Sequence, residues 1–519
     1  MTPDHLIVAP ILLPLLVGAL MLVVERYRPD VQGAIAIAAT VALCAVAIAL
    51  LQRAAGDEIG VYLLGNWPAP FGIALVADRL SALMVAMAAG VALAALVHAQ
   101  SRWARCGPHF HAFFQFQLAG LNGAFLTADL FNLFVFFELL LIASYALLLH
   151  AAGGRALRSG FHYVVVNLAG SSLFLIAASL FYALAGTLNL ADLAVKVAAA
   201  PAADAGLLRA AGLMLLVVFA LKAAVLPLGF WLPDTYGAAP APVAALFALM
   251  TKVGVYAILR TTTLVFGPDA GPVAGLGGPV LYALGVGTIV LGALGALAAP
   301  RLKGIVAFLV VVSAGTLVAA VADGTAQTLA GALYYLVHST LAAALLFLLV
   351  EAIARQRGAT GDRLWSAAPV AQPALLGLMF LGAAAAIAGL PPLPGFIGKL
   401  GILAATVDAP HAAWLWTALL GSGLVAMIAL ARAGSRIFWK VRQPQPDPAA
   451  VRVGGGELAA IAGLAGAVVA LAVFAAPAQQ YAMATAAQLL APRGYIERVL
   501  GAPPVTRRAA VAVAGEGAR

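Results

Sequence analysis

The chain of 519 residues is 64% hydrophobic and only 9% charged, with a mean hydropathy of +1.03. Soluble domains carry about 25% charged residues, so this composition excludes a water-soluble protein. Helices satisfy their own backbone hydrogen bonds in lipid, which favours an all-α integral membrane protein with spans of about 20 residues. The net charge of +9 resides in short loops, as expected for membrane topology, and predicts no nucleic-acid binding.

Apolar runs predict about fourteen transmembrane helices. The first run, in MTPDHLIVAPILLPLLVGALMLVV, lacks a basic region and a cleavage site, so it indicates a permanent span and not a signal peptide. The runs occupy residues 5–24, 32–52, 80–99, 112–127, 130–150, 161–185, 207–226, 242–266, 277–298, 304–322, 326–353, 372–406, 412–438 and 457–476.

Basic residues alternate between the two sets of loops, and this asymmetry predicts orientation. The loops expected inside contain Arg26, Arg28, Arg102, Arg105, Arg155, Arg158, Arg301, Lys303, Arg355, Arg357, Arg363, Arg436, Lys440, Arg442 and Arg452. The opposite loops contain only Arg53, Arg79, Lys196, Arg209 and Arg260. With an even number of spans, we expect a multi-pass protein of a bacterial inner membrane with both termini periplasmic.

Three segments outside the spans have patterns of their own. Residues 54–78 alternate polar and apolar side chains around Gly and Pro, which predicts a small hairpin on the outside. Residues 187–206 suit a short surface helix. Residues 478–501 suit an amphipathic helix lying on the membrane, and residues 503–519 form a tail.

Two spans are interrupted by proline beside a lysine. Lys222 and Lys252 lie in apolar runs separated by a segment with Pro227, Pro233, Pro240 and Pro242, which cannot stay regular helix. The segment 385–403, AAIAGLPPLPGFIGKLGIL, repeats this combination around Lys399. Paired broken helices are typical of inverted repeats in transporters, although two Pro-Gly breaks also arise by chance in a Gly-rich chain.

We therefore predict two inverted five-helix repeats, each with a discontinuous helix. The expected divisions are an N-terminal three-span region with the hairpin (1–110), a first repeat (111–270) and a second repeat (271–440). The last span and an amphipathic tail follow (441–519).

Five ionisable residues lie deep in apolar runs: Glu138, Lys222, Lys252, His338 and Lys399. Each costs roughly 2.5–3.5 kcal/mol at mid-bilayer, so each needs a partner or a function. Glu138 and Lys222 have a structural alternative, a static ion pair between two helices. His338 has one as well, a hydrogen-bonded packing histidine. Three lysines against one central glutamate nevertheless leave cations unmatched, and burial disfavours the charged form of an amine. These residues are candidates for loading and releasing protons.

Enzyme chemistry has no support in the sequence. We find no strand-placed G-x-G-x-x-G, no phosphate-binding loop and no metal-ligand cluster. The two cysteines, Cys44 and Cys106, leave no set of ligands for an iron–sulfur or structural zinc site. We expect no cofactor.

Several phrases together resemble the antiporter-like family of Mrp antiporters and respiratory complex I. They are FNLFVFFELLLIASYALL, LKAAVLPLGFWLPDTYGAAPAPVAAL, TKVGVYAILR, LYYLVHSTLAAALLFLL and GLPPLPGFIGK, and the resemblance extends over about residues 70–440. Within that family the chain is most similar to the D subunits of the Mrp (Pha, Mnh) monovalent cation/proton antiporters. The resemblance implies that Glu138, Lys222, Lys252, His338 and Lys399 translocate protons.

The resemblance further implies a subunit that works with other Mrp subunits in a hetero-oligomer, exchanging protons for Na⁺ or K⁺. A rival of another class is a proton-pumping subunit, similar to the L, M and N subunits of complex I or of a membrane-bound hydrogenase. A purely structural scaffold is a third alternative, which the five buried charges disfavour.

The loop asymmetry gives a direct test of topology. A reporter fused after Arg363 should be active only as a cytoplasmic marker, and one fused after Ala502 only as a periplasmic marker. The opposite signal at either site would rule out the fourteen-span orientation.

Overall fold

The computed structural model describes residues 4–27, 31–100, 109–150, 153–441 and 451–504. Several residues used above lie outside this described part, namely Arg28, Arg102, Arg105, Cys106, Arg442 and the tail from residue 505 onward.

The described chain is almost entirely helical, with one two-stranded sheet. The helices are α1 His5–Tyr27, α2 Gln32–Ala55, α3 Arg79–Gln100, α4 Phe110–Leu126, α5 Leu130–Leu149, α6 Gly154–Ala185, α7 Leu190–Ala198, α8 Ala205–Lys222, α9 Trp231–Ala238, α10 Ala241–Leu264, α11 Gly278–Ala298, α12 Leu302–Asp323, α13 Ala326–Gln356, α14 Pro373–Ala388, α15 Pro394–Ala405, α16 Ala412–Gly434, α17 Gly455–Val473, α18 Ala475–Leu490 and α19 Pro492–Leu500. The strands are β1 Gly60–Leu63 and β2 Ala74–Ala77.

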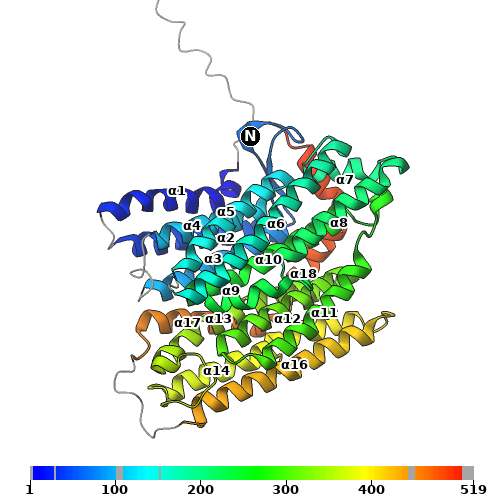
Figure 1. Ribbon diagram of the computed structural model, residues 1–519. Helices are drawn as coiled ribbons and strands as arrows, with labels where there is room; N and C mark the ends of the chain where they lie inside the picture. The colour runs from blue at the N-terminus through cyan, green and yellow to red at the C-terminus, as the bar shows by residue number, and fades with distance from the viewer. Residues whose placement is uncertain (1–3, 28–30, 101–108, 151–152, 442–450, 505–519) are drawn as a thin grey trace, which may run out of the picture.

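Twelve of the described helices are long and apolar enough to cross a membrane, which confirms a polytopic, helical membrane protein. The other two predicted spans correspond to α4, with 17 residues, and to the run that the structure divides into α14 and α15. In Figure 1 the long helices lie side by side in one bundle with a common direction. The total of fourteen spans, the inverted repeats and the domain divisions stay predictions.

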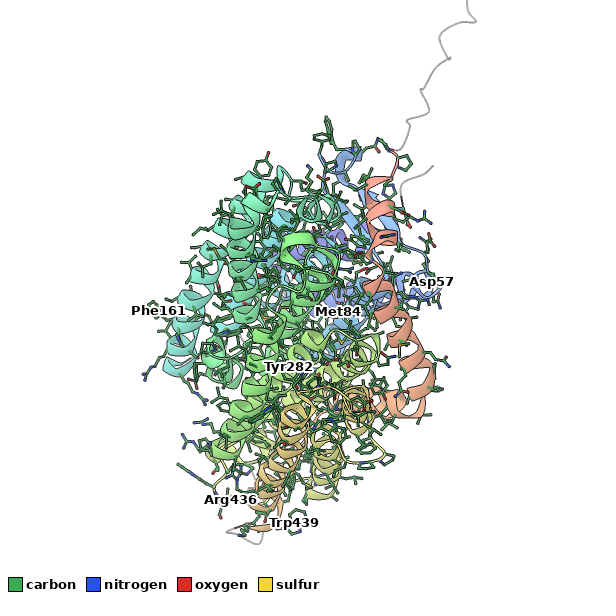
Figure 2. The ribbon with its side chains drawn as sticks, turned by 90° about the vertical axis from the view of Figure 1, so that its right-hand side faces the viewer. Asp57, Met84, Phe161, Tyr282, Arg436 and Trp439 are labelled. Carbon is green, nitrogen blue, oxygen red and sulfur yellow. The ribbon has the colours of Figure 1, made fainter. Side chains whose placement is uncertain are left out.

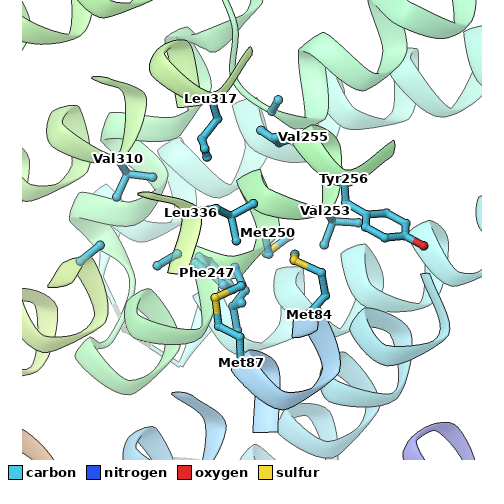
Figure 3. Packing of buried hydrophobic residues seen from close by; sticks show 14 of the residues in the cluster. Met84, Met87, Phe247, Met250, Val253, Val255, Tyr256, Val310, Leu317 and Leu336 are labelled. Atoms are coloured by element: carbon cyan, nitrogen blue, oxygen red, sulfur yellow. The ribbon is translucent and has the colours of Figure 1, made fainter. Parts of the chain in front are cut away.

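Helix α10 occupies the centre of the bundle. Its most apolar stretch is completely buried, unlike that of α1 or α17 on the periphery. It packs against α3, α8, α12 and α13, and Figure 3 shows methionines of α3 together with Val310, Leu317 and Leu336 around it. Any charge on α10 is therefore enclosed by protein on all sides.

The first predicted break separates α8 from α9. Lys222 is the last residue of α8, so it lies at an open helix end and not within a continuous helix as its apolar surroundings suggested. The open end finds partners inside the protein: the indole Nε1 of Trp231 donates to the carbonyl of Leu221 (3.2 Å), and the amide of Leu226 donates to Thr288 Oγ1 (2.9 Å). Irregular backbone at membrane depth persists only with such partners.

Helix α10 packs directly against this break through Gly254. A Cβ at Gly254 would lie 2.4 Å from the backbone nitrogen of Ala223. No other residue type permits this approach without displacing the backbone, so the glycine fixes the distance between the open end of α8 and α10.

The second break separates α14 from α15 beside Lys399, as expected. Gly389 follows the end of α14 with φ +90°, a left-handed conformation that favours glycine. The Lys399 ammonium, on α15, donates to the carbonyl of Ala388 at the end of α14 (2.9 Å). A cation at a helix C-terminus also complements the helix dipole, so Lys399 closes the open end.

The three segments outside the spans are structured at one end of the bundle. The stretch 54–78 contains β1 and β2, antiparallel with Gly60 opposite Ala77. The stretch 187–206 contains α7, which begins at the capping side chain of Asn189. The prediction of a single amphipathic helix over 478–501 is wrong, because this stretch contains parts of two helices, α18 and α19. The interruption lies at Pro492, which lacks the backbone N–H that a continuous helix needs. Figure 2 shows this C-terminal segment, in pale red, running down the right-hand side of the molecule past Asp57.

A buried ion pair ties this end together. Arg260, near the end of α10, donates both terminal nitrogens to the Asp78 carboxylate (2.6 and 2.9 Å). The guanidinium lies over the rings of Tyr256 (5.4 Å) and of Tyr495 from α19 (5.1 Å). Burial alone raises the pKa of the Asp78 carboxyl, but the charge and hydrogen bonds of Arg260, together with Ser81, hold that pKa below its ordinary value.

Removing one partner of this pair should destabilise the fold. We expect Asp78→Ala to cost about 3–5 kcal/mol, because the Arg260 charge then stays buried without its counterion. The measurement is thermal inactivation of protein extracted in detergent, with Glu58→Ala on the exposed loop as the control. Because the pKa of Asp78 is lowered in the folded state, the pair contributes fully to the free energy of unfolding at any pH above the ordinary carboxyl pKa of about 3.9. The pair should therefore not lose its contribution between pH 8 and pH 5. A loss of wild-type stability in this range that Asp78→Ala abolishes would contradict the lowered pKa of Asp78.

Candidate functional site

Glu138 lies on α5 toward the outside of the chain. It is half-buried and shares a helical stripe with Phe131, Val135 and Ile142, which are exposed. The hydroxyl of Ser171 on α6 donates to the Glu138 carboxylate. The carboxylate therefore sits between α5 and α6, close to the surface that faces lipid or another subunit.

Lys222 contacts the neighbouring turn of α6. Its ammonium donates to Asn167 Oδ1 (3.2 Å) and lies 5.9 Å from the centre of the Phe137 ring. Asn167 and Ser171 are one helical turn apart, so α6 presents one polar group to Lys222 and the next to Glu138. No ion pair joins Glu138 to Lys222, both of which are described. The direct pair suggested by the sequence is replaced by two contacts mediated by α6.

A small cavity adjoins the Lys222 ammonium. It measures about 10 Å³ and is lined by Asn167, Tyr163, Trp231 and Met250, among others. This volume is close to the minimum for one water molecule. Since a lysine ammonium has three donors and Asn167 accepts one, a water here would find a donor.

Lys252 is fully buried on the opposite side of α10. Its ammonium donates to Ser313 Oγ on α12 (2.6 Å). Met250, which lines the cavity beside Lys222, precedes Lys252 by two residues, about 200° around the helix. The body of α10 therefore separates the two lysines, and a proton passing between them has to go around this helix.

His338 and Lys399 come together at the second break. His338 is fully buried on α13, and within the described residues neither ring nitrogen has a hydrogen-bond partner of good geometry. A Cβ on Gly395, at the start of α15, would lie 2.7 Å from His338 Nε2 and 2.1 Å from the carbonyl of Ala386. The glycine thus lets the broken helix that carries Lys399 approach the imidazole.

The five residues form two groups and one link. Glu138 and Lys222 adjoin α6, His338 and Lys399 adjoin the α14–α15 break, and Lys252 lies between them, since α12 packs against both α10 and α13. Three hydrogen-bond partners of these residues were not predicted from the sequence, namely Asn167, Ser171 and Ser313. A signal for two of them was present: Asn167 and Ser171 are polar residues four apart in an apolar run and so share one helical face.

This arrangement holds titratable groups in series without a continuous chain of hydrogen bonds between the described side chains. Apolar side chains are packed together at the centre of the bundle, including Phe247 and Val253 of α10 and Leu336 of α13 (Figure 3). Each buried ammonium donates to a neutral oxygen, namely that of Asn167, of Ser313 or of the Ala388 carbonyl. A neutral partner accepts from the ammonium without fixing its charge, so the site is suited to carry protons in steps.

Known proteins share this fold and these segments. The family described as NADH:quinone oxidoreductase/Mrp antiporter, TM, matches residues 127–426. A protein of Rhizobium meliloti, named as the D subunit of a probable K(+)/H(+) antiporter, is 45% identical over 533 residues, 96% of this chain and 98% of that protein. The D subunit of the Na(+)/H(+) antiporter of Alkalihalophilus pseudofirmus is 38% identical over 501 residues, 96% of this chain and 99% of that protein.

A solved structure agrees with the sequence relatives. A chain of the Mrp complex from a Dietzia species superposes with a TM-score of 0.86 at 26% identity, covering 96% of this chain and 99% of that one. The chain therefore belongs to the D-subunit family of Mrp-type antiporters, in the membrane family shared with NADH:quinone oxidoreductase, and is a membrane subunit of a multisubunit cation/proton antiporter.

Proposed function

We propose that this chain moves protons through Glu138, Lys222, Lys252, His338 and Lys399, in exchange for Na⁺ or K⁺ moved by the assembled complex. The observation that carries the proposal is Lys252, fully buried at the centre of the bundle with a serine hydroxyl as its hydrogen-bond acceptor. An amine without a neighbouring carboxylate in low dielectric gives up its proton readily.

Each residue has a separate role in this proposal. Glu138 biases the charge of Lys222 through the polar face of α6. Lys252 and His338 pass the proton across the centre, and Lys399 is the terminal site at the second break. Inward proton movement is driven by about 2.3 kcal/mol per charge per 100 mV of membrane potential, in addition to the pH gradient.

The setting follows from the same proposal. The chain is a transporter subunit without enzymatic activity of its own, in a bacterial inner membrane with both termini periplasmic. The basic loops support this orientation. The relatives are named for K(+)/H(+) and for Na(+)/H(+) antiport, so both cations belong in the test.

A second candidate is a proton-pumping subunit of a redox complex, because the matching family includes NADH:quinone oxidoreductase. Neighbouring genes discriminate between the two: small antiporter subunits support exchange, whereas flavin or iron–sulfur subunits support pumping. The functional test is proton exchange in everted vesicles carrying the whole operon. Antiport predicts that adding Na⁺ or K⁺ makes the acidified vesicle interior more alkaline, and a redox pump predicts no such change without an electron donor.

Glu138→Ala should abolish cation-dependent proton exchange while the assembled complex remains in the membrane. The carboxylate then no longer supports the charge of Lys222, but few packing contacts are lost because Glu138 is half-buried. The measurement is antiport in vesicles alongside immunodetection of the complex. Full activity with reduced abundance would instead favour a purely structural role for Glu138, held between α5 and α6 by Ser171.

Lys399→Ala should stop turnover without loss of assembly, because Lys399 is expected to change its protonation state. Lys399→Arg should fail as well, since a guanidinium keeps its proton at any accessible pH. The arginine variant separates proton transfer from the structural role of Lys399, because a guanidinium can still donate to the carbonyl of Ala388. Near wild-type antiport in Lys399→Arg would show that a fixed positive charge suffices.

A further inference from the structure

A large cavity with charged walls lies at the opposite end of the bundle from the hairpin. It has a volume of about 260 Å³ and lies where α6, α9, α12 and α13 meet. Its charged lining consists of Arg155, Arg301, Lys303, Glu351 and Asp362. The volume far exceeds the roughly 10–15 Å³ that one water needs, so the cavity holds water, and the basic loops assign this end to the cytoplasm.

Most of the charged groups in this cavity are already engaged. Asp362 accepts from Arg301 (3.3 Å) and from the backbone amide of Lys303 (3.4 Å). The Lys303 ammonium donates to the carbonyl of Ala239, between α9 and α10. Glu351 differs: it has no hydrogen bond or ion pair to any described residue, and it is half-buried. Arg155 is the other charge of this lining without such a partner among the described residues, but a guanidinium does not release its proton.

The helices that line the cavity also carry the relay. Glu351 follows His338 on α13 by about 20 Å, and Lys303 precedes Ser313, the partner of Lys252, on α12 by about 15 Å. Lys303 also holds the start of α10 through Ala239. The cavity is therefore built on the inner ends of the elements that position Lys252 and His338.

One buried hydroxyl reaches into the interval between the cavity and Lys252. Tyr236 precedes Gly237, where α9 lines the cavity, and its hydroxyl donates to the carbonyl of Phe247 (2.6 Å). Phe247 lies on α10 about 7.5 Å before Lys252. Phe247 on α10 and Val310 on α12 are buried apolar residues along these two helices before Lys252 and Ser313 (Figure 3). The cavity thus reaches Glu351, whereas neither Lys252 nor Ser313 is among its lining residues.

We infer that this cavity is the aqueous mouth of the proton path on the cytoplasmic side and that Glu351 is the group that exchanges protons with it. The inference rests on the proposed function and adds a residue and an opening to it. The Glu351 carboxylate takes a proton from the relay and becomes a neutral carboxylic acid. It then passes this proton to cavity water and becomes a carboxylate again. Arg155, Arg301 and Lys303 line the same cavity as Glu351 and Asp362.

The first arm of the test compares Glu351→Gln with Glu351→Asp in vesicles carrying the whole complex. We expect Glu351→Gln to lower the maximal antiport rate by roughly tenfold, less than in a dry active site because cavity water substitutes in part. The cation concentration at half-maximal rate should not change, and Glu351→Asp should retain most of the rate. Glu497→Gln, the same substitution at an exposed position on α19, should match wild type. A wild-type rate in assembled Glu351→Gln overturns the role of Glu351.

The second arm tests the opening and does not depend on Glu351 variants assembling. Ala354→Cys, one turn from Glu351 on the cavity wall, is made in a Cys44→Ser, Cys106→Ser background. The impermeant thiol reagent MTSET should label it from the cytoplasmic side only, and labelling should inhibit antiport. Three outcomes would overturn the inference that this cavity is the cytoplasmic opening of the proton path: labelling from the periplasmic side, no labelling, or labelled protein with full activity. A wild-type complex without antiport would instead refute the proposed function.

Discussion

The structure depends on how two open helix ends are satisfied inside an apolar bundle. Unpaired carbonyl and amide groups in lipid cost several kcal/mol each, and protein groups satisfy them at the breaks after Lys222 and Ala388. Trp231 and Thr288 serve the first break, and the Lys399 ammonium serves the second. The same requirement explains why both breaks are enclosed by neighbouring helices.

Close helix contact at two glycines turns these breaks into a site. Gly254 brings α10 against the open end of α8, and Gly395 brings α15 against His338. A side chain at either position would push a broken helix away from the titratable group that it serves. Backbone approach, more than charge pairing, therefore sets the geometry, since the buried ammonium groups donate to neutral oxygens of Asn167, Ser313 and Ala388.

The two ends of the bundle differ in kind. At the hairpin end, the Asp78–Arg260 pair is buried, and the rings of Tyr256 and of Tyr495 from α19 lie against the guanidinium. At the other end, the charged residues around Glu351 line a cavity of about 260 Å³. One end of α10 therefore lies beside a cavity with charged walls and the other end carries a buried ion pair, with Lys252 fully buried between the two.

The sequence by itself determined the membrane class, the approximate spans, the breaks at the prolines and the five buried ionisable residues, because hydropathy and proline act locally along the chain. It did not determine which groups meet. Asn167 and Ser171 replaced the expected direct contact of Glu138 with Lys222, and Ser313 was not foreseen as the partner of Lys252. These contacts join residues far apart in the chain, so they depend on helix rotation and on packing at glycines. A hydropathy profile records how deep a residue lies in the membrane, whereas only the tertiary structure decides which way its side chain faces.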